Sequence, residues 1–165
     1  MLAAVRLAFA GLALAGLALA ATPAFADRPP TRAPGLWETA TITNAGRTVA
    51  RECIDARTDR IVRQATSGVT CRNDDFKRTA EGYAAGAICR SGGMSVDNKV
   101  EITGDFATFA RVATVTVMSG LPGEAGPRTF TSAIEARRLG DCQPDQRPGD
   151  VILPNGTVVN VPPAR

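Results

Sequence analysis

The sequence contains no histidine among its 165 residues. Histidine is the usual general base at neutral pH, a common zinc ligand and the base of a Ser-His-Asp triad. Its absence removes those sites, and we expect no catalytic residue of that kind and no bound metal. Aromatic residues are also scarce, with one Trp, one Tyr and six Phe.

Two cofactor motifs are missing as well. There is no Cys-x-x-Cys pair, and neither Gly92-Gly93 nor residues 120–126 are followed by the helix and lysine of a phosphate-binding loop. We therefore expect no cofactor. Lysine occurs only at Lys77 and Lys99, and the net charge is +3. This balance gives no indication of nucleic acid as a partner.

Residues 1–26 have the pattern of a signal peptide. A short start with Arg6 precedes an apolar run over residues 7–21, and Ala24-Phe25-Ala26 fits the small-x-small cleavage rule. We expect cleavage before Asp27 and a periplasmic or secreted chain. The run is shorter than the roughly 20 residues that span a bilayer, so we expect no membrane span after cleavage; the alternative is an uncleaved anchor.

Four cysteines in an oxidising compartment predict two disulfide bonds. The stretch from Cys71 to Cys89 predicts a β-hairpin whose turn lies at Glu81-Gly82, because a register centred on residue 80 places the two cysteines opposite each other. Phe76 and Ile88 would share the face opposite the sulfur atoms. The second bond is then Cys53–Cys142; the alternative for the first pair is two buried free thiols.

Short segments of alternating hydrophobicity predict an antiparallel sheet rather than βαβ units. The expected fold is mainly β, curled or packed on itself as a half-barrel or sandwich, with one short helix and two disulfides. The predicted strands cover residues 36–43, 47–54, 94–103, 106–118 and 128–139. The predicted helix covers Asp55–Ala65, with Asp55 or Thr58 as its cap.

The predicted division has four parts. Residues 1–26 form the signal peptide, residues 27–33 a flexible lead-in, residues 34–142 a disulfide-bonded β domain, and residues 143–165 a Pro/Gly-rich tail. The tail contains Asn155-Gly156, which predicts a small hairpin; an extended, partly ordered tail is the alternative.

Four residues are candidates for binding. Trp37 next to Glu38 resembles a sugar-binding pair, although Trp37 is more simply explained as a core residue. Arg137 and Arg138, near Asp141, suggest an anion site, although a surface ion cluster is the simpler explanation.

Several motifs together resemble one protein family. They are Pro34-Gly35-Leu36-Trp37-Glu38, Cys71 with Asp75-Phe76-Lys77-Arg78, Cys89, and Arg137-Arg138-Leu139-Gly140-Asp141-Cys142. The combination is similar to the domain of unknown function 3617 family, and the tail from Pro148 to Val161 resembles sequences that follow that domain. The resemblance implies an exported bacterial envelope protein with a mostly β domain. It implies no activity, and members place a Thr-Pro-Glu-like cap where this chain has Ile54-Asp55-Ala56.

These features favour a non-enzymatic exported domain that binds an envelope protein or a small apolar ligand. One alternative is an inhibitor of a secreted hydrolase that uses the loop Ser119–Pro127. Another is an envelope glycan enzyme, which needs two carboxylates from different strands about 5–9.5 Å apart; Asp74-Asp75 do not provide them, because adjacent strand residues point to opposite faces.

Overall fold

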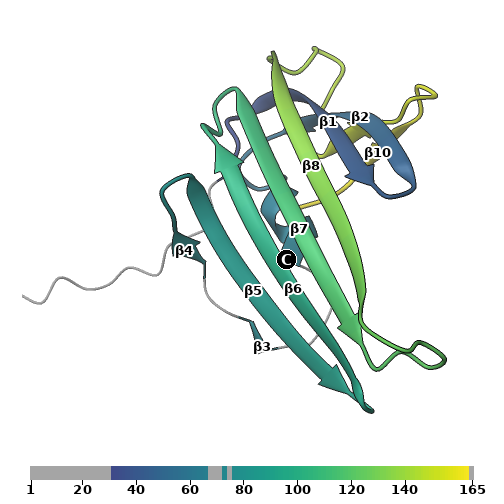
Figure 1. The fold of residues 1–165 in the computed structure, drawn as a ribbon. Coiled ribbons are helices and arrows are strands. Elements are labelled where there is room, and N and C mark those ends of the chain that lie inside the picture. Colours follow the sequence, from purple (N-terminus) through teal and green to yellow (C-terminus); the bar gives the residue numbers. More distant parts are fainter. Residues whose placement is uncertain (1–30, 67–71, 74–75, 164–165) are drawn as a thin grey trace, which may run out of the picture.

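The structure is a computed structural model that describes residues 31–66, 72–73 and 76–163. Ten strands and one short helix make up the described fold (Figure 1). The strands are β1 Gly35–Thr43, β2 Gly46–Ile54, β3 Arg72–Asn73, β4 Lys77–Arg78, β5 Gly82–Ser91, β6 Met94–Gly104, β7 Phe109–Ser119, β8 Arg128–Gly140, β9 Asp150–Ile152 and β10 Val158–Asn160. The helix is α1 Ile61–Thr66.

All strands belong to one open, antiparallel sheet, which confirms the mainly β prediction. Its order is β10-β9-β2-β1-β8-β7-β6-β5-β3, with β4 also paired to β5. Long strands β5 to β8 form the body of the sheet, and β1, β2, β9 and β10 extend it on one side (Figure 1). The described elements therefore form a single layer with a helix on one face, rather than a sandwich.

The core lies on the face toward α1, which we call the inner face. Ile61 and Val62 of α1 pack there against β6 and β7. Trp37, Ile102 and Val112 are at most 1% exposed. The opposite face, the outer face, is the one seen in Figure 1, where α1 lies behind the strands. Because alternate residues of a strand point to opposite faces, the predicted alternation assigned Val100 and Ile102 correctly to the core.

One predicted strand starts too early: β7 begins at Phe109 rather than Phe106. The carboxylate of Asp105 accepts hydrogen bonds from the backbone N–H groups of Ala107, Thr108 and Phe109, at 2.9, 2.7 and 2.9 Å. Phe106 has a φ of 58°. These local bonds hold a turn where the sequence predicted extended backbone.

The helix prediction was wrong at its start, since α1 begins at Ile61 rather than Asp55. The Asp55 side chain accepts hydrogen bonds from the backbone N–H groups of Arg57 and Thr58, at 3.0 and 2.8 Å, and from the Thr58 hydroxyl. Asp55 thus closes a turn of its own instead of capping a helix, which is the local competition expected of Asp and Thr.

The predicted hairpin forms, with one irregularity. Arg72 pairs with Ile88 and Asn73 with Ala87, in the predicted register. Near the turn, Lys77 pairs with Ala84, so the register there is shifted by one residue from the predicted one. Phe76 packs against the core, whereas Ile88 is 41% exposed, so these two side chains do not form the shared face that the sequence predicted.

One disulfide bond is described where the sequence predicted two. Cys53 and Cys142 are joined, with a Cα–Cα distance of 5.5 Å. Cys71 lies outside the described residues, so the Cys71–Cys89 bond stays a prediction. No cysteine within the described residues is free.

The tail is a hairpin attached to the sheet. β9 pairs with β2 through Arg51–Ile152 and Glu52–Val151, and β10 pairs with β9. The Leu153 N–H donates to the Thr157 carbonyl at 2.9 Å across the turn. The tail therefore forms a small hairpin about Asn155-Gly156, one of the two arrangements that the sequence left open.

Candidate functional site

A cluster of buried charges surrounds Arg32, which precedes β1. Its side chain is 2% exposed and lies against two carboxylates. Arg32 Nη2 is 2.9 Å from Glu52 Oε2 on β2 and 2.9 Å from Asp59 Oδ1, just before α1. Arg32 Nε and its backbone N–H also donate to Asp59, at 3.0 and 2.6 Å. The guanidinium thus ties the start of the domain to β2 and to the segment before α1.

Two residues of β1 complete the cluster on the inner face. Thr39 Oγ1 accepts from Arg32 at 3.3 Å and donates to Glu52 at 3.1 Å. The Arg32 guanidinium carbon lies 5.3 Å from the centroid of the Trp37 ring, which is the geometry of a cation–π contact. The indole N–H donates to the Ala33 carbonyl at 2.9 Å. Among the described residues, no buried side-chain nitrogen or oxygen lacks a hydrogen-bond partner, and this cluster is no exception.

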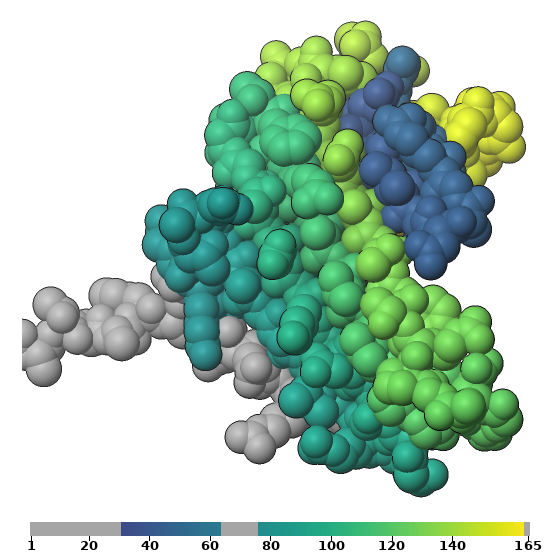
Figure 2. All heavy atoms as spheres, viewed as in Figure 1, coloured from purple at the N-terminus to yellow at the C-terminus, as the bar shows by residue number. Residues whose placement is uncertain are grey.

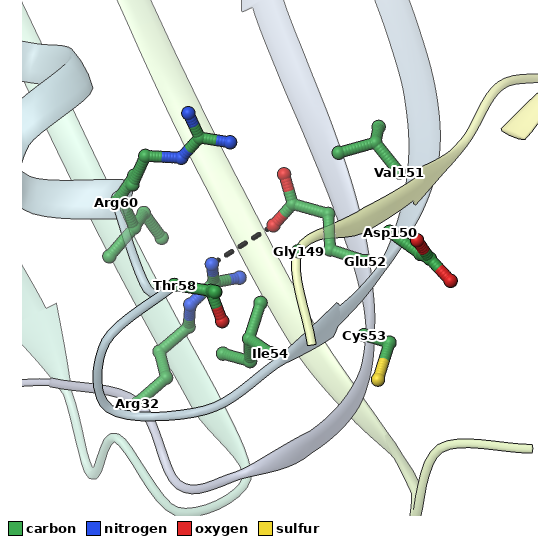
Figure 3. Close-up of a pocket in the computed structure, with 10 residues that line it drawn as sticks. Arg32, Glu52, Cys53, Ile54, Thr58, Arg60, Gly149, Asp150 and Val151 are labelled. Atoms are coloured by element: carbon green, nitrogen blue, oxygen red, sulfur yellow. Dashed lines mark hydrogen bonds and ion pairs between the residues drawn. The ribbon is translucent and has the colours of Figure 1, made fainter. Parts of the chain in front are cut away.

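The tail closes a small pocket beside this cluster (Figure 3). In Figure 3 a dashed line marks the hydrogen bond between Arg32 and Glu52, and the Arg60 side chain lies beside them. Gly149, Asp150 and Val151 of the tail line the pocket together with these side chains. Its cavity of about 10 Å³ has room for about one water molecule. Two carboxylates from different elements do converge here, but on an arginine, and no space remains beside them for a sugar.

Hydrogen bonds around Asp150 hold the tail against the pocket. The Asn160 amide donates to Asp150 Oδ1 at 2.7 Å, and the Arg147 N–H donates to Oδ2 at 2.8 Å. These bonds hold the pKa of Asp150 below its ordinary value, and the bond from the Asn160 amide has the largest effect. The Gly149 N–H donates to the Cys53 carbonyl at 2.8 Å. The tail is thus fixed by contacts at several points.

The outer face carries a larger hollow, which we call the β7–β8 groove. It has a volume of about 380 Å³. The lining residues are Ile42, Thr43, Asn44, Arg111, Ala113, Thr114, Val115, Thr131, Ser132 and Ala133. In the space-filling view, the surface falls back between the end of the β1–β2 hairpin (blue) and the lower part of β8 (light green) (Figure 2).

Strand register explains why this groove is hollow and apolar. Ala113 pairs with Ala133, and Ala133 pairs with Ile42, so two methyl groups and one larger side chain form a row across three strands. At one end, Arg111 lies 3.5 Å from Glu135. At the other end, the Thr131 hydroxyl donates to Asn44 at 3.2 Å. The floor is therefore apolar and the rim polar.

A second hollow, of about 350 Å³, lies over β5 on the same face. Small residues from Ala84 to Ala87 form its floor, and Lys77, Asp97, Lys99 and Glu101 contribute to its walls. Its walls thus carry charges of both signs, which makes it the more polar of the two.

The predicted pair Trp37 and Glu38 is separated by the sheet. Trp37 is 0% exposed and packs in the core. Glu38 points to the outer face, where its carboxylate lies 3.9 Å from Arg51. The two side chains do not converge on one surface, and their binding role stays a prediction.

Arg137 and Arg138 also point to opposite faces. The Arg137 guanidinium carbon lies 5.0 Å from the centroid of the Phe109 ring. Arg138 donates to the Pro34 carbonyl and to Asp141, the latter at 2.7 Å. Arg138 is thus occupied by protein groups, and a binding role for the two arginines stays a prediction.

The loop of the inhibitor hypothesis has some internal structure. The Glu124 N–H donates to the Leu121 carbonyl at 3.1 Å, and the Glu124 carboxylate lies 2.8 Å from Arg128. Inhibition stays a prediction. The described residues contain no group of three or more metal-ligating side chains, and no helix among them has the length and apolar character to cross a membrane.

The Arg32 cluster was missed by the sequence analysis, which assigned Arg32 and Ala33 to the lead-in. Arginine is by far the commoner basic residue in this chain, so Arg32 does not stand out among them. Asp59 carried a weak signal, because it stands two residues before the apolar pair Ile61-Val62. Only the fold shows that it meets Arg32.

The family model described as "Protein of unknown function (DUF3617)" matches residues 32–142. The chain belongs to this family. The DUF3617 match begins at the buried Arg32 and ends at the disulfide-bonded Cys142, so the tail lies beyond it. No curated protein and no solved structure was found to match this DUF3617 chain.

Proposed function

We propose that this DUF3617 protein is exported and acts as a non-catalytic domain that binds a small apolar ligand in the β7–β8 groove. The observation that carries the proposal is the groove itself, about 380 Å³ in volume with a floor of Ile42, Ala113 and Ala133. Ligand sites are typically concave and mostly apolar, about 300–1,000 Å³ in volume, with a few polar groups at the rim.

Two observations support export. Residues 1–26 have the order of a signal peptide, with a basic start, an apolar run and small residues before Asp27. The Cys53–Cys142 bond fits an oxidising compartment, where disulfides form and persist. Periplasm and medium both meet this requirement.

The polar rim restricts the kind of ligand. Arg111 and Glu135 oppose each other across β7 and β8, and Asn44 bonds to Thr131, so these groups already satisfy one another. A charged ligand would have to displace these contacts. An uncharged apolar molecule with a small polar end keeps them and covers the floor.

The arrangement of carboxylates supports a binding role rather than glycan hydrolysis. Glu52 and Asp59 both accept hydrogen bonds from Arg32, which lies between them. A glycosidase needs room for a water and a sugar between its two acids. The cavity of about 10 Å³ does not provide it.

A groove-filling variant tests the proposal. Ala133→Phe places a ring over the floor, whereas Thr129→Phe places the same ring on the same face of β8 but outside the lining residues. Titration with the uncharged apolar dye N-phenyl-1-naphthylamine should show at least tenfold weaker binding for Ala133→Phe and unchanged binding for Thr129→Phe. Native protein from the exporting cell should release a small apolar molecule on extraction.

Equal dye affinity in the two variants, or no binding by the unaltered protein, would overturn the groove as the site. Recovery of the unprocessed chain from the cytoplasm would overturn export independently. A stable protein partner whose binding survives Ala133→Phe would favour the alternative of an envelope protein as the ligand.

A further inference from the structure

The last strand, β10, has an open edge. It ends the sheet order, and no strand in the described ranges pairs with its outer side. The Val161 N–H donates to the Gly149 carbonyl, and the Leu153 N–H donates to Thr157, so the backbone groups of residues 157, 159 and 161 face β9. Backbone groups of antiparallel strands alternate in direction. Those of Val158 and Asn160 therefore face outward.

The edge is short and is followed by Pro162-Pro163, but it lacks the charged side chains that usually protect an exposed strand. Natural edges carry charges, bulges or covering segments. Here residues 151–161 contain no charged residue at all. Val158 and Val159 are 55% and 46% exposed, and Leu153 in the adjoining turn is 38% exposed. The edge is therefore apolar on both faces and presents unused hydrogen-bonding groups.

The edge is also fixed in position before any partner arrives. The Asp150–Asn160 bond and the Gly149–Cys53 bond hold the hairpin against β2. The Cys53–Cys142 disulfide anchors the start of the tail. A partner strand would thus meet an already ordered backbone, which lowers the entropic cost of pairing.

We propose that β10 pairs antiparallel with β10 of a second copy of this chain, about a two-fold axis through Val159. In this register Val158 of each copy faces Asn160 of the other, and the outward groups form about four hydrogen bonds. The two Val159 side chains meet on the axis, in the closely spaced type of pair. A second copy fits because the edge is its own complement and no like charges oppose each other.

The proposed pairing has a limited size. Only three residues of each copy lie in the strands, and Pro162-Pro163 follows, which cannot continue the ladder. A two-fold pairing uses up both edges, so it closes at a dimer and does not grow into a fibre. Because the interface is small, we expect a weak, reversible dimer.

Two single cysteine substitutions test the register of the proposed pairing. Each is made in the full chain, and the protein is purified in the form that the expressing cell produces. Val159→Cys places two thiols across the axis, within reach of a disulfide. Val158→Cys places them diagonally, about 7–8 Å apart, beyond such reach. Under mild oxidation Val159→Cys should form covalent dimers at least ten times faster. If the covalent dimers formed by random collisions instead, Val158→Cys would cross-link faster, because Val158 is the more exposed position.

Mass measurements test the backbone contribution. The mass of the unaltered protein in sedimentation should approach twice the monomer value as concentration rises from about 10 μM to about 1 mM. Val158→Pro removes an outward N–H and should stay monomeric, whereas Val158→Ala keeps it and should still associate. A monomer at all concentrations, equal cross-linking at 158 and 159, or full association of Val158→Pro would overturn the proposal.

Discussion

At the scale of single residues, Arg32 carries the largest structural consequence. Its guanidinium is buried between Glu52 and Asp59, and its central carbon lies over the Trp37 ring. Taking charges out of water is costly, and such a group is tolerated only when its hydrogen bonds are satisfied. Removing the arginine would leave two carboxylates close together without their counter-charge.

Arg32→Met should therefore lower the free energy of unfolding by about 3–5 kcal/mol, the usual cost of breaking a buried ion pair. Arg57→Met is the matched control, because the Arg57 side chain is 80% exposed and pairs with Asp55 at 3.6 Å. Exposed pairs contribute about 0–1 kcal/mol. Urea unfolding of the two variants measures the difference, and equal effects would contradict the structural role of Arg32.

A combined variant separates charge from shape. Replacing Glu52 with Gln and Asp59 with Asn in the Arg32→Met background removes the uncompensated charges. Part of the lost stability should then return. No recovery would indicate that packing of the arginine stem on Trp37, rather than its charge, carries the effect.

Asp105 gives a prediction for pH. Hydrogen bonds from the Thr108 hydroxyl and from the backbone N–H groups of Thr108, Phe109 and Ala107 hold its pKa well below the ordinary value of 3.8. A carboxyl with a lowered folded-state pKa adds stability that is complete above its unfolded pKa and is lost as pH falls through the folded one. The loss should therefore begin below about pH 4.

Asp105→Asn should reduce the melting temperature at about pH 6, and the difference from the unaltered protein should narrow below about pH 4. Thermal unfolding followed by circular dichroism across this range measures it. Asp145→Asn, at an exposed position in the tail, serves as the control. If the difference in melting temperature between Asp105→Asn and the unaltered protein stayed constant down to the lowest pH, the role of the ionised carboxylate would be contradicted.

At the scale of elements, the strands were predictable and the helix start was not. Val96, Val100 and Ile102 alternate with Asp97, Lys99 and Glu101, and this period fixes both the strand and its buried face. The segment after Cys53 has apolar residues at helical spacing. This spacing does not reveal that the Asp55 carboxylate and the Thr58 hydroxyl bond to each other and to nearby backbone. Because of these bonds, the helix begins only at Ile61.

The attachment of the tail depends on Gly149, which has a φ of 99°. A Cβ at this position would lie 2.5 Å from the Val161 carbonyl oxygen. Gly149→Ala should therefore cost about 1–3 kcal/mol, through backbone strain and this contact. Gly156→Ala, also at positive φ but with no atom within 4 Å of the added Cβ, is the control for strain alone.

Limited proteolysis of the tail, followed by mass spectrometry, measures this effect locally. Gly149→Ala should release fragments after Cys142 faster than Gly156→Ala does. Equal rates would mean that the close approach to Val161 does not hold the tail.

At the scale of the whole molecule, sequence patterns predicted the class of fold and the family. Local patterns such as strand alternation and the Asn155-Gly156 turn are visible within a few residues. The Arg32 cluster and the β7–β8 groove depend on contacts between distant strands. Ala113 and Ala133 look unremarkable in the sequence, and only their pairing with Ile42 makes a floor.

Thiol counting on the unfolded, unreduced protein tests the predicted sulfur chemistry. No reactive thiol should be found before reduction and four after it, because Cys53–Cys142 is formed and Cys71–Cys89 is predicted. Two reactive thiols before reduction would contradict the Cys71–Cys89 bond alone. Four would contradict both.

The bond between Cys53 and Cys142 has a topological consequence. It is formed between residues 89 positions apart, so most of the domain forms a closed covalent ring. A protease that cuts one peptide bond inside this ring opens it without separating two pieces. In a non-reducing gel such nicked protein would run as a single chain, and its fragments would part only when a reductant is added.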